Sequence, residues 1–293
     1  MKNLTDLIGN TPLVDLSSLL PAHSKVKLFG KLEGQNPGGS VKDRAAYYMI
    51  TGALERGELK EGVRIVEATS GNTGIALAMI ASQFKLPITL IMPENSTVER
   101  VQTMRAYGAE VILTPAEKTI EYSRELAEEM AATEEYFQLN QFANPDNWRA
   151  HYRTTGPEIW RDTNQQITHF VSSMGTTGTI TGTSRYLKEQ SQEVQIVGVQ
   201  PKEGSRIPGI RRWSPEFLPK IYEPDRVDRI IDVSRDESIA TMRRLATEAG
   251  VFAGVSSGGS TTAALKLAEG LEEGLIVCII CDRGDRYLSS GIY

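Results

Sequence analysis

The sequence predicts an α/β protein whose sheets are mostly parallel. Two observations lead to this prediction. Strand-like and helix-like stretches alternate from about residue 60 to the end of the chain. Turns rich in Gly, Ser and Thr also occupy three places where a strand is expected to join a helix, at residues 69–74, 175–179 and 256–259. In an open parallel sheet such turns line the crevice at the carboxyl ends of the strands, where ligands bind.

In the first half of the chain the expected elements follow one another closely. An extended segment at 26–32 leads into the loop Asn36-Pro37-Gly38-Gly39, and Ser40 with Asp43 has the spacing of a helix cap. Strands are expected at 63–66, 86–92 and 109–113. The intervening helices are expected at 75–82, from a cap at Ser96 and Glu99 to Tyr107, and from the segment Thr114-Pro115-Ala116-Glu117 onward.

A polar crossover at 141–147 interrupts this rhythm and predicts a domain boundary. Beyond it we expect a helix at 151–163, strands at 169–172, 194–199 and 275–281, and a helix that carries Ile180 and Leu187. Ser234 with Glu237 predicts one further capped helix. Residues 204–219 show no periodicity and are interpreted as an ordered surface loop.

Composition excludes several classes of function. The 293 residues carry 32 basic and 37 acidic side chains, a formal charge of −5, so neither nucleic acid nor an anionic membrane is an expected partner. No apolar run approaches the roughly 18 residues that span a bilayer, and the first residues lack a signal-peptide core, so we expect a cytoplasmic protein. Cys278 and Cys281 should face opposite sides of one strand, and three scattered histidines make a metal site unexpected.

Lys42 is the strongest candidate for chemistry. It falls in the first turn of a predicted helix, where the free amides and the helix dipole disfavour a cation. A neutral lysine on a rigid turn suits Schiff-base chemistry with a carbonyl cofactor. The alternative is a solvated surface lysine whose charge Asp43 balances.

The segment Gly175-Thr176-Thr177-Gly178-Thr179 is the best candidate for a phosphate cup, because glycine lets the backbone approach and the hydroxyls add donors. It is not the dinucleotide fingerprint G-x-G-x-x-G, so a monophosphate fits better than a pyrophosphate. Together with Lys42 and a second anion-binding turn, the cup points to pyridoxal 5'-phosphate (PLP) acting on an amino acid.

These landmarks resemble those of the cysteine synthases, which belong to the tryptophan-synthase-β-like (fold-type II) group of PLP enzymes. The resemblance also covers Gly9-Asn10-Thr11-Pro12-Leu13-Val14, and residues 207–213 and 279–289 are similar to the B-type enzymes, the O-acetylserine sulfhydrylases B. It implies two three-layer α/β/α domains with PLP in the cleft between them. A smaller, mobile N-terminal domain would comprise residues 1–12 and 35–145, and a larger C-terminal domain residues 13–34 and 146–293.

The resemblance also implies roles for individual residues. Lys42 would hold the cofactor and remove the substrate α-proton, and Ser256 would face the pyridine nitrogen, where its neutral hydroxyl weakens the electron sink. O-acetyl-L-serine would then lose acetate to give a bound aminoacrylate, which sulfide attacks to make L-cysteine. The phosphate would be held by Gly175, Thr176, Thr177, Gly178 and Thr179, and the substrate carboxylate by Thr69, Ser70, Asn72, Thr73 and Gln141, with Asn72 also at the phenolic oxygen.

Alternatives remain open at this stage. Thr69 and Ser70 could merely cap their helix, Gln141 could satisfy backbone groups, and Ser257 competes with Ser256 for the ring nitrogen. The activity could use O-phosphoserine as donor, or it could be that of a serine or threonine dehydratase. A non-enzymatic scaffold that docks serine acetyltransferase is a further alternative. The resemblance implies a homodimer.

The sulfur donor is suggested by arginines rather than by the resemblance alone. Sulfide needs no anchor, whereas planar guanidinium groups suit an oxyanion such as thiosulfate, which would yield S-sulfocysteine. Arg211 is the first candidate. The alternative is that the arginines are held in ion pairs by Asp282, Asp285 or Glu216. Four arginines lie in the segments 207–213 and 279–289, the two loops expected beside the pocket: Arg211, Arg212, Arg283 and Arg286.

Overall fold

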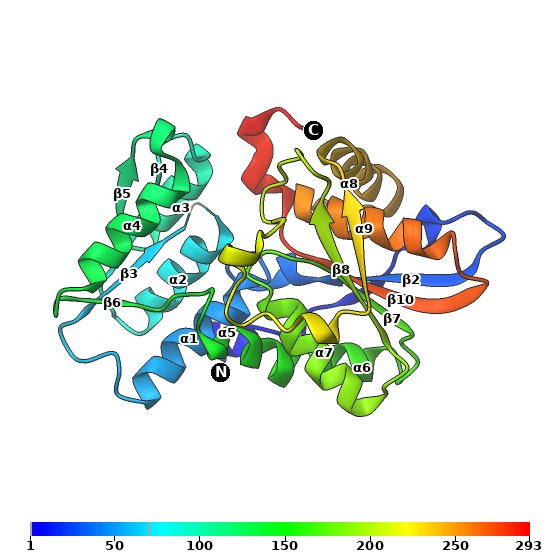
Figure 1. Cartoon of the computed structure of the whole chain (residues 1–293), viewed down its shortest axis with the longest axis horizontal. Coiled ribbons are helices and arrows are strands. Elements are labelled where there is room, and N and C mark those ends of the chain that lie inside the picture. Colours follow the sequence, from blue (N-terminus) through cyan, green and yellow to red (C-terminus); the bar gives the residue numbers. More distant parts are fainter. Residues whose placement is uncertain (1, 70) are drawn as a thin grey trace.

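The computed structural model describes residues 2–69 and 71–293, whose strands form two sheets, one in each lobe of the molecule (Figure 1). The smaller sheet has the order β5-β4-β3-β6 and the larger sheet the order β1-β2-β10-β7-β8-β9. The strands of the smaller sheet are β3 (Arg64–Ala68), β4 (Ile88–Pro93), β5 (Glu110–Thr114) and β6 (Tyr136–Gln138). Those of the larger sheet are β1 (Leu13–Asp15), β2 (Lys25–Leu32), β7 (His169–Ser173), β8 (Gln195–Pro201), β9 (Arg229–Val233) and β10 (Glu273–Ile280).

The predicted parallel α/β architecture is confirmed. Among the described strands, each pair of neighbours runs parallel except β1 with β2. Parallel sheets need cover on both faces, and every residue of β4 is accordingly buried and all but Thr89 are apolar. Strands β1, β6 and β9 were not anticipated, because each is short and half-exposed and lacks the apolar run that marks β4.

Helices cover both faces of the smaller sheet. One face packs through Ile65 and Leu90 against α1 (Lys42–Glu55), α2 (Asn72–Gln83) and α3 (Val98–Ala106). The opposite face packs through Val66 and Ile91 against α4 (Thr119–Ala131). Alternate residues of β3 thus point into different layers, as the period of a strand requires.

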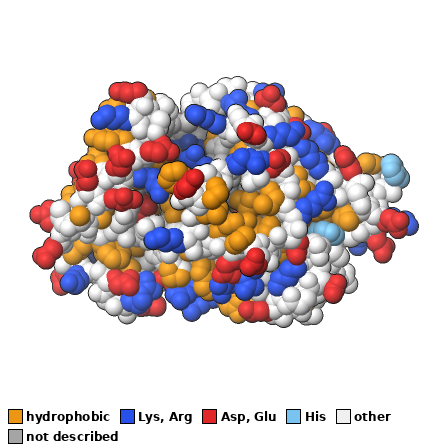
Figure 2. Space-filling view, viewed as in Figure 1, with side chains coloured by type: hydrophobic (Ala, Val, Ile, Leu, Met, Phe, Trp, Pro, Cys, Tyr) orange, Lys and Arg blue, Asp and Glu red, His pale blue; other side chains and the backbone are white. Residues whose placement is uncertain are grey.

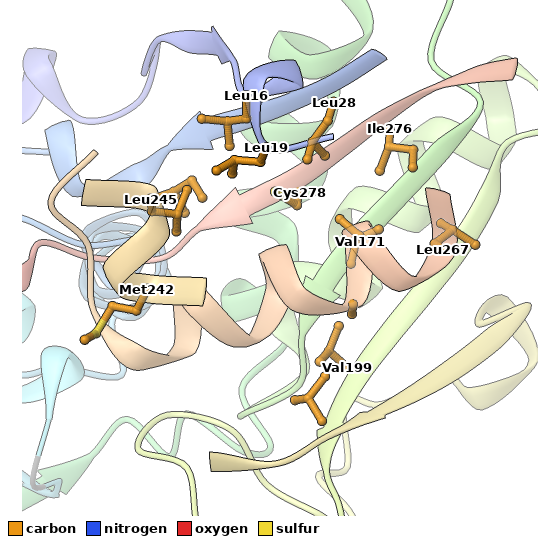
Figure 3. Close-up of a cluster of buried hydrophobic side chains, with 14 of the residues drawn as sticks. Leu16, Leu19, Leu28, Val171, Val199, Met242, Leu245, Leu267, Ile276 and Cys278 are labelled. Atoms are coloured by element: carbon orange, nitrogen blue, oxygen red, sulfur yellow. The ribbon is translucent and has the colours of Figure 1, made fainter. Parts of the chain in front are cut away.

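The larger sheet is also covered on both faces. Its main apolar cluster joins Val171, Ile276 and Cys278 to α8 (Arg235–Ala249) and α9 (Val255–Ala268) (Figure 3). The other face packs through Phe170 and Val277 against the helices α6 (Gly156–Asp162) and α7 (Gly178–Gln190). Within residues 2–69 and 71–293, no helix is both long and apolar enough to cross a bilayer.

The chain passes between the lobes through α5 (Pro145–Ala150), a π-helical turn at His151–Thr155, and α6. The predicted helix at 151–163 is therefore two short elements instead of one, the π-helical turn and α6. Asn144 caps α5 by accepting a hydrogen bond from the amide of Asp146 at 2.9 Å. In the sequence, this crossover follows β6 of the smaller sheet and precedes β7 of the larger sheet, at the position of the predicted domain boundary.

Three of the predicted helix starts are wrong. Thr114 lies in β5, and α4 begins at Thr119 after a 3-10 turn at Ala116–Lys118, not at Pro115. Asp43 accepts a hydrogen bond from the amide of Gly38 at 2.5 Å, and Ser40 accepts one from the amide of Lys42, so the pair forms no capping box. Ser96 is not the cap of α3 either, because the helix begins at Val98 and Glu99 accepts hydrogen bonds from the amide and hydroxyl of Ser289. The third box is confirmed, since Ser234 and Glu237 cap α8 reciprocally.

The turn at 256–259 also differs from expectation. It was predicted to follow a strand, but α9 begins at Val255 only a few residues after α8 ends, and Ala253 makes an isolated bridge with Arg283. The turns at 69–74 and 175–179 do join strands to helices, β3 to α2 and β7 to α7. The segments 69–74, 175–179 and 256–259 nevertheless contribute residues to one cavity.

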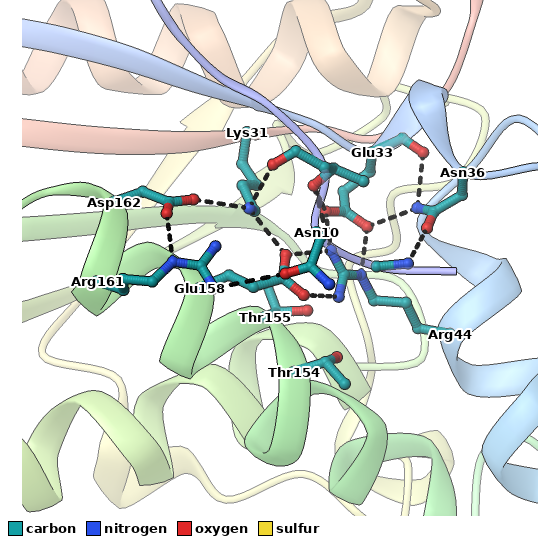
Figure 4. A network of polar contacts seen from close by, with 12 residues as sticks. Asn10, Lys31, Glu33, Asn36, Arg44, Thr154, Thr155, Glu158, Arg161 and Asp162 are labelled. Atoms are coloured by element: carbon teal, nitrogen blue, oxygen red, sulfur yellow. Dashed lines mark hydrogen bonds and ion pairs between the residues drawn. The ribbon is translucent and has the colours of Figure 1, made fainter. Parts of the chain in front are cut away.

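A buried network of charges joins the first turn of α1 to the larger lobe (Figure 4). Arg44 donates to Glu33 at 2.7 and 2.8 Å and to Glu158 at 2.6 and 2.8 Å. Lys31 reaches Glu158 at 2.8 Å and the carbonyl of Thr11 at 2.6 Å. Because every member has partners, these charges can stay ionised away from water and fix the orientation of the turn.

Candidate active site

Most of the sequence-predicted site residues meet at a cavity of about 950 Å³ between the lobes, whereas Gly178 does not line it and packs against Asn147. This volume suits a cofactor together with a small substrate. Basic side chains gather beside the notch between the lobes in Figure 2. Ser70 falls outside the described residues. The lining includes Lys42, Thr69, Asn72, Thr73, Gln141, Gly175, Thr176, Thr177, Thr179, Arg211, Ser256 and Cys281.

Lys42 opens α1 and is half-buried in the cavity wall. The preceding residue, Val41, donates its amide to the carbonyl of Cys281 at 2.8 Å, so the loop is fixed to the end of β10. Burial lowers the pKa of Lys42, and Cys281, Asp282 and Glu33 act in the opposite direction. No hydrogen bond or ion pair holds its Nζ among residues 2–69 and 71–293. Burial, rather than the helix dipole, is the main cause of the shift toward the neutral amine.

The phosphate cup lies between β7 and α7. Thr177 has φ 70°, a left-handed conformation that turns the chain just before Gly178 opens the helix. A Cβ at Gly175 would lie 2.7 Å from the carbonyl oxygen of Gly209, so only glycine allows the loop at 204–219 to approach this closely. The indole of Trp213 donates to the carbonyl of Gly175 at 2.8 Å.

The hydrogen-bond donors of the phosphate cup suit a monophosphate. The free amides at the start of α7 and the hydroxyls of Thr176 and Thr179 offer several donors to one small anion. The cup and Lys42 line the same cavity, as a phosphorylated aldehyde held at both ends would need.

The substrate turn at the end of β3 lies in the same cavity. Thr73 donates its hydroxyl to Oε1 of Gln141 at 2.8 Å, which joins two residues predicted to hold the carboxylate. Asn72 donates to Asp282 at 2.7 Å and accepts a hydrogen bond from Arg286. Both partners of Asn72 come from the other lobe, and sequence reasoning missed them.

The structure distinguishes the two serines at the start of α9. Ser256 lies in the cavity wall. Ser257 is fully buried, and its hydroxyl accepts a hydrogen bond from the amide of Cys281 at 2.9 Å. Cys281 also borders the cavity, and burial raises the pKa of its thiol to about 11, so it is neutral at ordinary pH.

The four predicted arginines do not share one environment. Arg212 pairs with Asp232, Arg283 pairs with Asp285, and Arg286 donates to Asn72 and to the carbonyl of Gly38. Arg211 is exposed at the cavity, and among the described residues its side chain has no hydrogen-bond or ion-pair partner.

His151 and His169 both contact threonine hydroxyls. His151 is buried behind the cup, with Nδ1 2.9 Å from the hydroxyl of Thr155 and Nε2 3.3 Å from that of Thr179. Burial lowers the pKa of His151 to about 3, so the ring is neutral. His169 lies 2.8 Å from the hydroxyl of Thr168.

Two buried residues near the site were not singled out from the sequence. Asn147 donates to the carbonyl of Gln141 and to the hydroxyl of Thr176. Glu67 accepts a hydrogen bond from the amide of Asn140 at 2.9 Å. The signal for Asn147 was its place as the third residue of a helix that starts after Asn144 with Pro145, within the polar crossover. A carboxylate in the apolar run of β3 was the signal for Glu67.

Comparisons with known proteins agree with this geometry. Residues 4–282 match the family described as pyridoxal-phosphate dependent enzyme. The chain is 59% identical to cysteine synthase B of Pseudomonas aeruginosa over 99% of this chain and 97% of that protein. It is 56% identical to cysteine synthase B of Escherichia coli over 100% of this chain and 96% of that protein. A crystal structure of cysteine synthase from Entamoeba histolytica superposes with a TM-score of 0.94 at 37% identity, over 100% and 90% of the two chains. The chain therefore belongs to the pyridoxal-phosphate dependent enzymes, and among them to the cysteine synthases of type B.

Proposed function

We propose that the protein forms L-cysteine from O-acetyl-L-serine and sulfide by a PLP-dependent β-replacement. The observation that carries the proposal is Lys42, an amine of lowered pKa without a side-chain partner among the described residues, in the same cavity as the phosphate cup. Membership of the cysteine synthases supports the reaction type.

When bound, the cofactor supplies an electron sink for the α-carbon of the amino acid. Lys42 would hold the carbonyl carbon of the cofactor until the substrate amine displaces it, and the freed Lys42 amine would then accept the proton from the substrate α-carbon. The cup at 175–179 binds the phosphate. Ser256 meets the ring nitrogen with a neutral hydroxyl, and the engagement of Ser257 with Cys281 supports this choice. Thr69, Asn72, Thr73 and Gln141 orient the substrate carboxylate, and Ser70 is proposed for the same role from its place in the turn.

The direct test is a donor comparison. The purified protein, loaded with PLP, is given sulfide with either O-acetyl-L-serine or O-phospho-L-serine, and L-cysteine is quantified. We expect cysteine from O-acetyl-L-serine. A preference for O-phospho-L-serine would show that this compound, and not O-acetyl-L-serine, is the amino-acid substrate. A keto acid formed without sulfide would identify a dehydratase. Cofactor binding without any turnover would support the scaffold alternative.

We also propose thiosulfate as a second sulfur donor, with S-sulfocysteine as product. The observation that favours it is the exposed Arg211 side chain at the cavity, which makes no hydrogen bond or ion pair within residues 2–69 and 71–293, although a hydrogen bond from Thr119 and the Arg211 charge both lower the pKa of Glu121. A guanidinium group suits the several oxygens of thiosulfate and gives sulfide no comparable contact.

Arg211→Ala should therefore slow the thiosulfate reaction by roughly 10- to 150-fold, the equivalent of one charge-assisted hydrogen bond. Its rate with sulfide should stay near that of the parent. Arg283→Ala, which removes an exposed arginine paired with Asp285, is the matched control. Equal losses with both donors would mean that Arg211 has a structural role, and a parent enzyme inert to thiosulfate would refute this second activity.

A cytoplasmic homodimer is proposed from the resemblance to cysteine synthases, as is docking of serine acetyltransferase. Light scattering at working concentration tests the first part: a mass of one chain, 32.3 kDa, would exclude the dimer. Co-migration of the protein with serine acetyltransferase in gel filtration tests the second, and elution of two separate peaks would exclude a stable complex.

A further inference from the structure

Asn147 connects the two halves of the active site. It lies in α5 and is only 3% exposed. Its Nδ2 donates to the backbone carbonyl of Gln141 at 2.7 Å and to the hydroxyl of Thr176 at 3.1 Å. Gln141 belongs to the proposed substrate-binding side, whereas Thr176 belongs to the phosphate cup. The two hydrogens of the Asn147 amide are thus donated to Gln141, which is proposed to bind the amino acid, and to Thr176, which is proposed to bind the phosphate.

The position of the Asn147 side chain is fixed from its other end. A Cβ on Gly178 would overlap Oδ1 of Asn147, so the amide oxygen occupies the space that a side chain at the start of α7 would fill. Asn144 caps the same helix through the amide of Asp146 and donates to the carbonyl of Leu139 at 2.9 Å. The backbone carbonyl of Gln141 can only accept a hydrogen bond, so the NH2 group of Asn147 must face it, and its second hydrogen points to Thr176.

The turn that carries Gln141 is held on its other side as well. Glu67, at the end of β3, accepts a hydrogen bond from the amide of Asn140 at 2.9 Å. Asn140 has φ 53°, a left-handed conformation that local contacts must maintain. Thr73 donates to Oε1 of Gln141 at 2.8 Å. Asn147 supplies a direct hydrogen-bonded link from this turn to the phosphate cup, beside an indirect one in which Phe142 contacts Trp213, whose indole donates to the Gly175 carbonyl.

The direction of the hydrogen bond at Thr176 matters for the cup. Because the hydroxyl accepts from Asn147, its own proton is left for a different acceptor. Thr176 lines the cavity, so an anion there receives a donor that is already oriented. Without Asn147 the hydroxyl would be free to rotate and donate elsewhere.

We propose that Asn147 is a positioning residue that couples the phosphate cup to the turn that carries Gln141. A phosphate in the cup would accept a hydrogen bond from Thr176, and Asn147 would transmit the position of Thr176 to Gln141. The inference rests on the proposed function. It predicts that Asn147 strengthens the binding of the cofactor through its phosphate, and strengthens the binding of the amino acid through Gln141. A residue that merely filled the space beside Gly178 would have neither selective effect.

The first test separates the phosphate from the rest of the cofactor. The full chain, freed of cofactor, is titrated with PLP and with pyridoxal, which lacks the phosphate, for the parent and Asn147→Ala. The dissociation constant for PLP should rise roughly 10-fold, the value of one to two hydrogen bonds, while that for pyridoxal stays within about twofold. The control is Asn144→Ala, which loses the cap of the same helix but no contact with the cup. It should lower the melting temperature without changing the ratio of the two constants.

The second test reads the substrate side by steady-state kinetics. Asn147→Ala should raise the KM for the amino-acid substrate roughly 10-fold and leave the KM for sulfide unchanged. Thr176→Val keeps the size and branching of the side chain but removes the acceptor. It should raise the same KM, and adding Asn147→Ala to it should cause little further change, because the link is already broken.

Three results would overturn the inference: equal weakening of PLP and pyridoxal, an unchanged KM for the amino acid, or full additivity of the two substitutions. If Asn147→Ala does not fold, the KM of Thr176→Val for the amino acid tests the inference alone, since this substitution changes no residue of the turn that carries Gln141. Failure of the proposed function is a separate result, in which the parent itself forms no covalent link with PLP through Lys42.

Discussion

Lys42 and Arg44 stand two residues apart in the first turn of α1, and their surroundings are opposite. Arg44 is fully buried and meets the carboxylates of Glu33 and Glu158, which raise its pKa (Figure 4). Lys42 lines a cavity, burial lowers its pKa, and among the described residues no carboxylate pairs with it.

The contrast shows how one turn serves structure and chemistry together. A buried cation with its partners in place is stable and fixed, whereas one deprived of partners is pushed toward its neutral form. Because both residues share a helical turn, the Arg44 network orients the backbone that presents Lys42. The firmly paired charge thus supports the reactive one.

The largest expected effect comes from breaking the paired side of this comparison. Arg44→Ala leaves Glu33 and Glu158 buried without their main partner. We expect a loss of about 3 to 5 kcal/mol in the free energy of unfolding, measured by urea denaturation.

The matched control is Arg56→Ala at the end of the same helix, where the arginine is 39% exposed and pairs with Glu58 and Asp146. An exposed ion pair contributes about 1 kcal/mol or less, so this variant should be much closer to the parent. Similar losses for the two variants would contradict the distinction between a buried network and a surface pair.

A smaller effect is expected at Glu67, an acidic counterpart of Lys42. It is buried, the backbone amide of Asn140 donates to it, and Arg124 attracts it, yet burial raises its pKa from 4.5 to about 7. Because the folded-state pKa is the higher one, protonation of Glu67 stabilises the fold below about pH 4.5. This contribution is lost as the pH rises through about 7.

Glu67→Gln keeps an acceptor for the Asn140 amide and cannot ionise. Relative to the parent, it should gain ~2 to 3 kcal/mol of unfolding free energy between pH 5 and pH 8, measured by urea denaturation at each pH. Asp43, whose pKa burial also raises to about 7, is present in both proteins and cancels in the difference. A difference that does not change with pH would show that Glu67 titrates normally.

Much of the fold could be predicted because its signals are local. The apolar run of β4 and the Ser234 and Glu237 box of α8 depend on residues close in sequence, and both predictions hold. The predicted cap at Ser96 and Glu99 failed because Ser289, 190 residues away, takes the Glu99 carboxylate. A sequence pattern cannot rank a local partner against one brought near by folding.

The same reason limits what could be predicted of the site. The cup and Lys42 have signatures within a few residues, and the structure brings them to one cavity. The partners of Asn72 could not be anticipated, because Asp282 and Arg286 lie 210 and 214 residues further along the chain. Among the predicted arginines, only the folded structure separates Arg211 from the paired Arg212.

The central claim is that Lys42 carries the cofactor. The most direct measurement is borohydride reduction of the PLP-loaded protein, followed by mass spectrometry of its peptides. We predict a single pyridoxyl adduct, on Lys42, which is absent from Lys42→Ala and retained in Lys60→Ala, where an exposed lysine is removed. An adduct on a different lysine, or one that persists in Lys42→Ala, would contradict the account.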